Sequence, residues 1–377
     1  MRIRFSLFDD VSTPYLRSTL ASYEHVPSLD GLRAVSIIAV MFTHFIFPHG
    51  PGGYGVFLFF IISGFLITRL LFAEQKIQKV DLKAFYIRRV FRLYPVLLVL
   101  TLTAIIVGQL LYRNFDFGEV GAALFYYSNF LIVHKELNNI PWQMNAFQVF
   151  WSLSVEEHFY IAFPFLFVLL RTPVKILMLA LFVVVACTIG RYTMAVAHPE
   201  LISTHYFGML TQYRIDSIAL GVALAALCEM PSGNILLRQA GNYFVMAIAL
   251  AVLIAGFAFL RDPALKTALR WPLLGFPILV FTSAIIFSPK YRVPIAILNH
   301  PVMVWTGKLS YSLYVWHVLA GYAAFALVPN APGAALAIIF AYLLATGSYF
   351  LVERPMIAVG RRIRHKHRER VPVTGLR

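Results

Sequence analysis

The sequence predicts an all-α, polytopic membrane bundle of about ten transmembrane helices, with both termini in the cytoplasm. Of its 377 residues, 60% are hydrophobic and only 13% are charged, and the mean hydropathy is +0.75. A soluble domain is about half apolar and about a quarter charged, so these side chains cannot cover a water-exposed surface. The two cysteines, Cys187 and Cys228, both lie in apolar stretches. The composition therefore excludes a soluble enzyme, a disordered chain and a disulfide scaffold.

Ten apolar segments are long enough to cross a bilayer, which takes about 20 residues of helix. They cover residues 32–48, 54–73, 92–112, 150–170, 174–196, 212–229, 239–260, 272–288, 301–327 and 334–353. Helices are expected because backbone polar groups cannot stay unpaired in lipid. The apolar segment 119–133 is shorter, and we expect a re-entrant or interfacial helix there. No internal repeat of the kind found in many transporters is visible.

The distribution of Lys and Arg orients the bundle, because basic residues concentrate on the cytoplasmic side. The link 74–91 and the C-terminal segment 361–370 are strongly basic, whereas the links 49–53 and 328–333 carry no Lys or Arg. Both termini are therefore predicted to lie in the cytoplasm, which requires an even number of spans.

Three basic residues, Arg261, Lys266 and Arg270, depart from this pattern because the scheme places them outside. The larger basic clusters in the link 74–91 and the segment 361–370 decide the predicted orientation. The predicted division is a cytoplasmic arm over residues 1–28, a membrane domain over 29–356 and a basic cytoplasmic tail over 357–377. A basic tail directly after a membrane helix indicates contact with anionic lipid and not with nucleic acid.

Ionisable side chains inside membrane helices are costly, so they usually face a cavity or a partner. Those in or at the ends of the spans include Arg33, His44, Arg92, Glu156, Glu157, His158, Arg214, Asp216 and His317. Arg33 and His44 are eleven residues apart, so they lie about 16 Å apart along one helix, on about the same face. Arg33 is expected at the cytoplasmic surface and His44 beyond the midplane.

These residue types suit acyl transfer from a phosphorylated carrier. A neutral imidazole can act as general base towards a hydroxyl, and a carboxylate can hold the tautomer of that imidazole. Arginines at a cytoplasmic entrance suit phosphates, which they bind in a bidentate manner. Transport and structural pairing are the alternatives that the same residues allow.

Seven motifs, in this order, resemble those of the membrane-bound acyltransferase-3 family, which O-acylates sugars and other envelope or natural-product acceptors. They are LDGLRAVSIIAVMFTHF (29–45), FFIISGFLIT (59–68), FYIRRVFRLYP (85–95), FWSLSVEEHFY (150–160), YRIDSIALG (213–221), LSYSLYVWH (309–317) and ERP (353–355). The resemblance covers about residues 28 to 356. One departure is His158, where the family commonly has Gln, so a role for this residue stays open.

The resemblance implies a role for each matching position. His44 would be the catalytic base, with Glu156, alone or together with Glu157, orienting a catalytic group or the acceptor. Of the two glutamates, Glu156 is favoured, since adjacent residues point about 100° apart on a helix. His317 and Asp216 are secondary candidates.

The donor implied by the resemblance is a cytosolic acyl-CoA, most often acetyl-CoA, with no metal ion. Arg33 would hold the donor or the polar network beneath it, while Arg89 and Arg92 would bind the coenzyme A phosphates. Arg214, together with Asp216, is a candidate for substrate binding. The acceptor would be a hydroxyl of an envelope or exported glycan or glycolipid, and the location a bacterial inner (plasma) membrane.

Several of these features also have plain structural explanations. Arg33, Arg89 and Arg92 would serve equally as cytoplasmic anchors, and Gly64 and Gly221 are expected to allow close helix packing. A proton-coupled transporter would use the same buried His and Glu groups as a proton relay. A catalytically silent relative that binds an envelope glycan is a second alternative.

Overall fold

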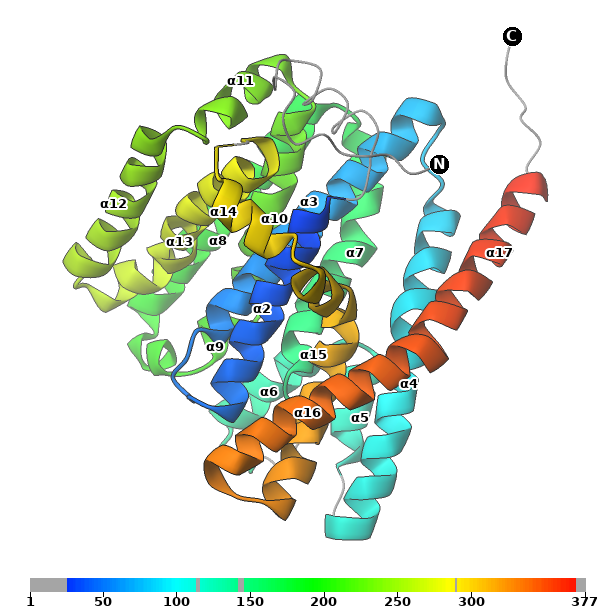
Figure 1. Cartoon of the computed structure of the whole chain (residues 1–377). Helices are drawn as coiled ribbons and strands as arrows, with labels where there is room; N and C mark the ends of the chain where they lie inside the picture. The colour runs from blue at the N-terminus through cyan, green and yellow to red at the C-terminus, as the bar shows by residue number, and fades with distance from the viewer. Residues whose placement is uncertain (1–25, 113–115, 142–145, 289, 371–377) are drawn as a thin grey trace.

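The fold is all-helical, as the composition predicts. The computed structural model describes residues 26–112, 116–141, 146–288 and 290–370, and over these residues it contains helices and no β-strand (Figure 1). The first seven helices are α2 (Pro27–Phe45), α3 (Gly52–Ile77), α4 (Leu82–Tyr112), α5 (Phe117–Leu124), α6 (Ser128–Leu137), α7 (Phe150–Leu170) and α8 (Pro173–Ala197). After the short η1 (Pro199–Ser203) come α9 (Tyr206–Met209), α10 (Thr211–Cys228), α11 (Pro231–Gln239), α12 (Tyr243–Phe259), α13 (Pro263–Phe287), α14 (Arg292–Leu298), α15 (Pro301–Leu327), α16 (Asn330–Ser348), η2 (Tyr349–Glu353) and α17 (Arg354–Arg370).

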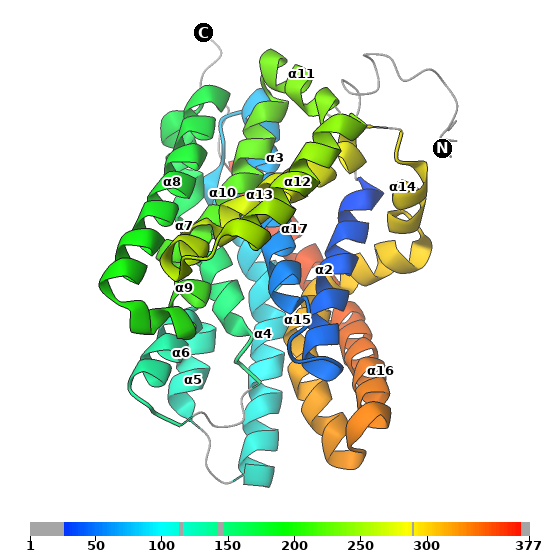
Figure 2. The same cartoon turned by 90° about the vertical axis from the view of Figure 1, so that its left-hand side faces the viewer.

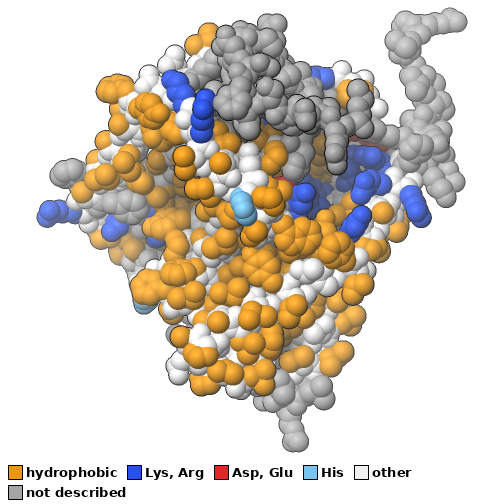
Figure 3. Space-filling view, viewed as in Figure 1, with side chains coloured by type: hydrophobic (Ala, Val, Ile, Leu, Met, Phe, Trp, Pro, Cys, Tyr) orange, Lys and Arg blue, Asp and Glu red, His pale blue; other side chains and the backbone are white. Residues whose placement is uncertain are grey.

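Seven of the described helical segments are long and apolar enough to cross a membrane, or eight if the bent pair α9–α10 and α11 forms one span. Apolar side chains cover most of the face in Figure 3, and the visible Lys and Arg side chains lie at its upper left, at its left-hand edge and in a group to the right of centre. The chain is therefore a multi-pass membrane protein. The two further predicted spans correspond to α12, whose described apolar run over 243–256 is shorter, and to α15, which has the length but not the hydropathy. The count of ten and the orientation stay predictions.

Two helices begin well before the predicted span boundaries, because a capping residue starts each one in a polar stretch. Asp81 accepts a hydrogen bond from the Ala84 amide at 2.9 Å, and α4 runs from there. Asp262 accepts one from the Leu265 amide at 2.6 Å and starts α13. Side-chain caps of this kind satisfy amides that the helix leaves unpaired. Several of the basic residues that the span prediction assigns to the links before these spans therefore lie in the first turns of α4 and α13.

The segment 119–133 is not one helix but parts of two short ones. α5 and α6 are separated at Tyr126, whose φ of 55° breaks the helical path. Lys135 on α6 binds Asp116 at 2.6 Å and also Glu119, so it ties α6 to the start of α5. Neither helix is long enough to span the bilayer.

The glycines expected to permit close packing do so between α3 and α10. A Cβ added at Gly221 would lie 1.9 Å from the backbone oxygen of Ile61, and one at Gly64 would lie 2.1 Å from that of Ile218. Any larger residue would push these helices apart, so this part of the prediction is confirmed. Elsewhere α15 packs between α2 and α16 (Figure 2).

The two ends of the predicted domain scheme are only partly described. Residues 1–25 of the arm and 371–377 of the tail lie outside the described residues. The predicted start of the tail at residue 357 falls inside α17, which continues from α16 through one π-helical turn, η2.

Candidate active site

A cavity of about 280 Å³ lies between α2, α3, α4, α7 and α15. α2, α3 and α4 are consecutive in the chain, whereas α7 and α15 come from later segments, and the cavity brings together four of the predicted site residues. Its polar lining residues are Arg33, Ser63, Arg89, Arg92, Ser152, Glu156, Tyr160, Ser310, Tyr311 and Tyr314. The cavity thus combines three guanidinium groups with one carboxylate, which leaves a net positive charge on its walls.

Two of the three arginines, Arg33 and Arg89, are held in place by a neighbouring helix. Arg33 on α2 donates from Nε to the Ser310 hydroxyl on α15 at 3.1 Å. The guanidinium of Arg89 lies 4.2 Å from the ring centroid of Tyr160 on α7, a distance typical of a cation–π contact. Such contacts fix the side chains in advance, so binding an anion costs them little conformational entropy.

Glu156 on α7 is anchored by hydroxyl groups. Its Oε1 accepts a hydrogen bond from Ser63 at 2.7 Å, and its Oε2 lies 3.4 Å from the Tyr160 hydroxyl. Tyr160 in turn lies 3.0 Å from Ser63. Glu157 follows directly on α7 and does not line the cavity. The two glutamates point in different directions, as consecutive helical residues must.

His44 and His317 form a direct pair between α2 and α15. His44 Nδ1 lies 2.7 Å from His317 Nε2, and the two rings are within 3° of parallel. His317 Nδ1 lies 2.8 Å from the backbone oxygen of Tyr314. A carbonyl oxygen can only accept, so the His317 proton sits on Nδ1 and its Nε2 accepts from His44. In the neutral pair, His44 Nε2 then carries a free lone pair.

The histidine pair lies next to one end of the cavity. Tyr314 lines the cavity and its ring centroid is 5.6 Å from that of His317. The Tyr314 hydroxyl is 2.6 Å from Ser152 Oγ and donates to the Val149 backbone oxygen at 3.0 Å. His317 is fully buried, whereas His44, in the last turn of α2, is solvent-accessible. His44 itself is not among the residues that line the cavity.

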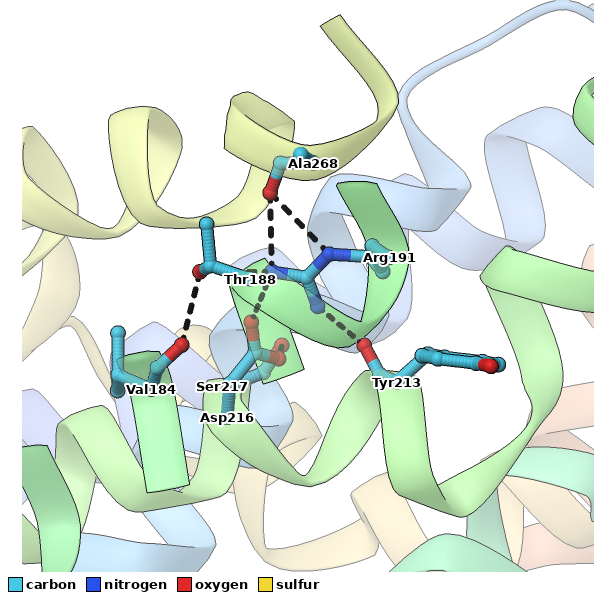
Figure 4. A network of polar contacts seen from close by, with 7 residues as sticks. All are labelled: Val184, Thr188, Arg191, Tyr213, Asp216, Ser217 and Ala268. Atoms are coloured by element: carbon cyan, nitrogen blue, oxygen red, sulfur yellow. Dashed lines mark hydrogen bonds and ion pairs between the residues drawn. The ribbon is translucent and has the colours of Figure 1, made fainter. Parts of the chain in front are cut away.

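Asp216 lies elsewhere, in a buried ion pair with Arg191, a residue that the sequence analysis did not single out. Arg191 Nη2 on α8 is 2.7 Å from Asp216 Oδ2 on α10, and both side chains are almost fully buried (Figure 4). Arg191 also binds the backbone oxygens of Tyr213 and Ala268. Pro272 has no N–H to give to the Ala268 oxygen, so Arg191 replaces the missing helical partner. The signal available was an arginine inside the predicted span 174–196.

Arg214 is also buried away from the cavity, among aromatic rings. Its Cζ lies 3.5 Å from the ring centroid of Trp271, and the rings of Phe57, Phe60 and Trp151 are within 6 Å. Substrate binding by Arg214 and Asp216 stays a prediction that these contacts do not favour. His158, also outside the cavity, binds the Thr211 hydroxyl through Nδ1 at 2.7 Å.

The positive charge of the cavity suits an anionic ligand. Over the described residues, no three His, Cys, Asp or Glu side chains converge as metal ligands. The three arginines present guanidinium donors of the kind that bind phosphate. Glu156 lines the cavity and the histidine pair lies beside it, next to Tyr314, so both can supply acid and base groups there.

Comparison with known proteins shows which family this chain is similar to. The profile of a family described as "Acyltransferase domain" matches residues 26–353. The O-acetyltransferase OatA of Staphylococcus aureus strain NCTC 8325 is 32% identical over 315 residues, and a candidate O-acetyltransferase of strain COL is 32% identical over 311 residues. Each alignment covers 78% of this chain and 50% of the relative. The chain thus spans about half the length of the curated relatives that it matches, and no solved structure matches it. With nearly all of its described helices inside the matched region, the chain belongs to the acyltransferase-3 family.

Proposed function

We propose that the protein is a membrane-bound O-acyltransferase, with His44 as the general base. It would transfer an acyl group, acetyl in the simplest case, from acyl-CoA to a hydroxyl of a carbohydrate acceptor in the cell envelope. The observation that carries the proposal is the hydrogen bond of His44 to His317, next to a cavity lined by three arginines. The family and the names of the relatives support O-acetylation.

The donor enters from the end of the cavity that carries the arginines. Arg33, Arg89 and Arg92 bind the phosphates of coenzyme A, since guanidinium groups form strong charge-assisted bonds to phosphate. The remaining walls are largely apolar, with Val56, Phe59 and other side chains of α3. Such a surface accommodates the pantetheine arm, and it directs the thioester towards Tyr314 and the histidine pair.

The chemical step needs one base and returns its proton. His44 Nε2 takes the proton from the acceptor hydroxyl while His44 Nδ1 stays bonded to His317. The acceptor oxygen attacks the thioester carbonyl, the carbon–sulfur bond breaks, and the thiolate leaves with the proton that His44 returns. The acceptor is then an ester and the donor is free coenzyme A. General base catalysis of this kind contributes about 10² to 10⁴ in rate.

His317 is a positioning residue in this scheme. Its Nδ1 is committed to the Tyr314 backbone oxygen, so its Nε2 can only accept from His44 in the neutral state. This arrangement selects the His44 tautomer in which Nε2 is the base. Glu156, held by Ser63, offsets part of the positive charge of the cavity and orients the groups that line it.

We place the protein in a bacterial inner membrane with both termini in the cytoplasm, so that the arginines face the acyl-CoA pool. The basic links predict this orientation. The solvent-accessible His44 then lies towards the outer side, where an exported glycan or glycolipid would arrive.

The test is thiol release from acetyl-CoA by purified protein in nanodiscs, measured with and without an envelope glycan fraction. We expect release to require His44 and to fall by at least about 10² in His44→Ala. The matched control is His49→Ala, a histidine in the loop that follows α2 and outside the proposed site. Equal release by both variants would refute the role of His44. A folded protein with no release and no acetyl-CoA binding would instead favour the transporter, which needs no coenzyme A.

A further inference from the structure

A second cavity shares no lining residue with the proposed active site. It has a volume of about 520 Å³ and lies between α12 and α13 beside Tyr54 at the start of α3. Its walls are apolar, including Ala249, Leu253, Leu274 and Ile278. α12 lies at the edge of the bundle and packs against α13 (Figures 1 and 2). We call this cavity the α12–α13 groove.

Two basic residues continue the wall of this groove along α13. Lys266, Arg270, Leu274 and Ile278 follow at intervals of four residues, so they lie along one face of the helix. The two basic side chains are exposed, and the two apolar ones line the groove. Arg270 lies one turn from the nearest lining residue, about 6 Å along the axis.

This end of the groove has an excess of positive charge. Neither Lys266 nor Arg270 forms an ion pair within the described part of the chain. Arg270 instead lies 5.0 Å from the ring centroid of Trp271, which Arg214 approaches at 3.5 Å. Asp262, one turn before Lys266, accepts a hydrogen bond from the Leu265 amide and pairs with neither cation, and the buried Asp216 is already paired with Arg191. An anion bound here would therefore meet uncompensated cations.

We propose that the α12–α13 groove binds an anionic membrane phospholipid, with one hydrocarbon chain in the groove and its phosphate on Lys266 and Arg270. The apolar walls match the chain, and the exposed cations match the head group. The same ligand accounts for the position of Lys266 and Arg270, which lie on the outer side in the predicted orientation, against the usual excess of basic residues inside. A phospholipid is favoured because the cations directly continue an apolar wall, as a head group continues its chain.

The test compares nanodiscs of phosphatidylcholine alone with nanodiscs that contain one third phosphatidylglycerol. We expect phosphatidylglycerol to raise the unfolding temperature of the full chain and to be retained in native mass spectra after detergent extraction. Lys266→Gln/Arg270→Gln should lose the shift and retain about tenfold less of this lipid, because both charge-assisted contacts to the phosphate are gone. The control Lys83→Gln/Lys175→Gln removes two exposed lysines from α4 and α8, and should keep both effects.

A second variant addresses the groove itself. Leu253→Trp fills the space between α12 and α13, so it should abolish lipid retention while leaving Lys266 and Arg270 in place. If Leu253→Trp does not fold, the comparison of the wild type with Lys266→Gln/Arg270→Gln tests the proposal by itself. The proposal is overturned if phosphatidylcholine stabilises the protein as much as phosphatidylglycerol, or if Lys266→Gln/Arg270→Gln keeps the shift. Retention of a polyprenyl-linked lipid in place of the phospholipid would also overturn it. None of these readouts depends on acyltransferase activity.

Discussion

His44 Nδ1 and His317 Nε2 lie 2.7 Å apart, with their rings within 3° of parallel. The two residues are 273 positions apart in the chain, yet the Tyr314 backbone oxygen fixes the direction of the hydrogen bond between them. The pair is therefore directional, because His317 donates to a carbonyl and accepts from His44. This direction makes His44 Nε2 the basic atom, and it gives His317 a role that can be tested apart from that of His44.

Replacing His317 should separate its role in hydrogen bonding from its role in packing. His317→Gln keeps an amide oxygen that can accept from His44, whereas His317→Leu keeps the bulk and removes the acceptor. We expect His317→Leu to lower kcat by about 10² or more with little change in KM for acetyl-CoA. His317→Gln should recover a substantial part of the loss. Equal activity of the two variants at equal folded yield would contradict the tautomer argument.

Replacing the cavity arginines should affect the donor and not the chemical step. Arg89→Gln and Arg92→Gln each remove charge-assisted bonds to phosphate, worth about 1.5–3 kcal/mol, so KM for acetyl-CoA should rise about tenfold or more. The measurement is initial-rate kinetics, supported by thermal stabilisation with coenzyme A. Arg88→Gln is the control, because Arg88 binds Glu74 at 3.3 Å and does not line the cavity. A similar KM in all three variants would argue against phosphate binding.

The helical fold and the four charged residues of the cavity could be predicted from the sequence, because apolar length and motif order are local properties. Arg33, Arg89, Arg92 and Glu156 do converge on one cavity. The partner of His44 could not be read from spacing, since it depends on how α2 packs against α15. Helix starts were missed for a different reason, because hydropathy does not register caps such as Asp262.

The buried Arg191–Asp216 pair shows a second reason why the sequence does not predict every contact. The sequence makes Asp216 a candidate for substrate binding. It does not indicate that the partner of Asp216 is Arg191 on α8, although Arg191 lies inside a predicted span. A charged residue in lipid needs a partner, but the sequence does not say whether that partner is a ligand or another helix. The contacts of Arg191 with α10 and α13 answer this for Asp216 (Figure 4).

Breaking this pair should destabilise the protein strongly. Arg191→Met leaves the Asp216 carboxylate buried and alone, and the expected loss is about 3–5 kcal/mol of unfolding free energy. Arg191→Met/Asp216→Leu should recover part of the loss, since no unpaired charge remains. Recovery should stay incomplete, because the Ala268 oxygen loses the partner that replaces the missing N–H of Pro272. Thermal unfolding in one detergent compares the wild type with the two variants, and a double variant no more stable than Arg191→Met would contradict the pairing.

The contact between α5 and α6 should depend on pH. A hydrogen bond from Lys135 lowers the pKa of Asp116 below its usual range. Burial opposes the charge of Lys135, but its bonds to Asp116 and Glu119 outweigh this and raise its pKa. A carboxyl group with a lowered pKa stabilises the fold above its unfolded pKa, and this contribution is lost as the pH falls through the folded value. The ammonium contribution is lost only at strongly alkaline pH.

Asp116→Asn isolates this contribution, because an Asn still caps α5 through the bond that Asp116 accepts from the Gly118 amide at 2.7 Å. We expect Asp116→Asn to unfold at a lower temperature than the wild type at pH 7, and the difference to shrink below about pH 4. Asp262→Asn is the matched control, because Asp262 caps α13 and forms no ion pair within the described residues. A difference for Asp116→Asn that stays constant between pH 7 and pH 3.5 would mean that the charge of Asp116 does not hold α5 to α6.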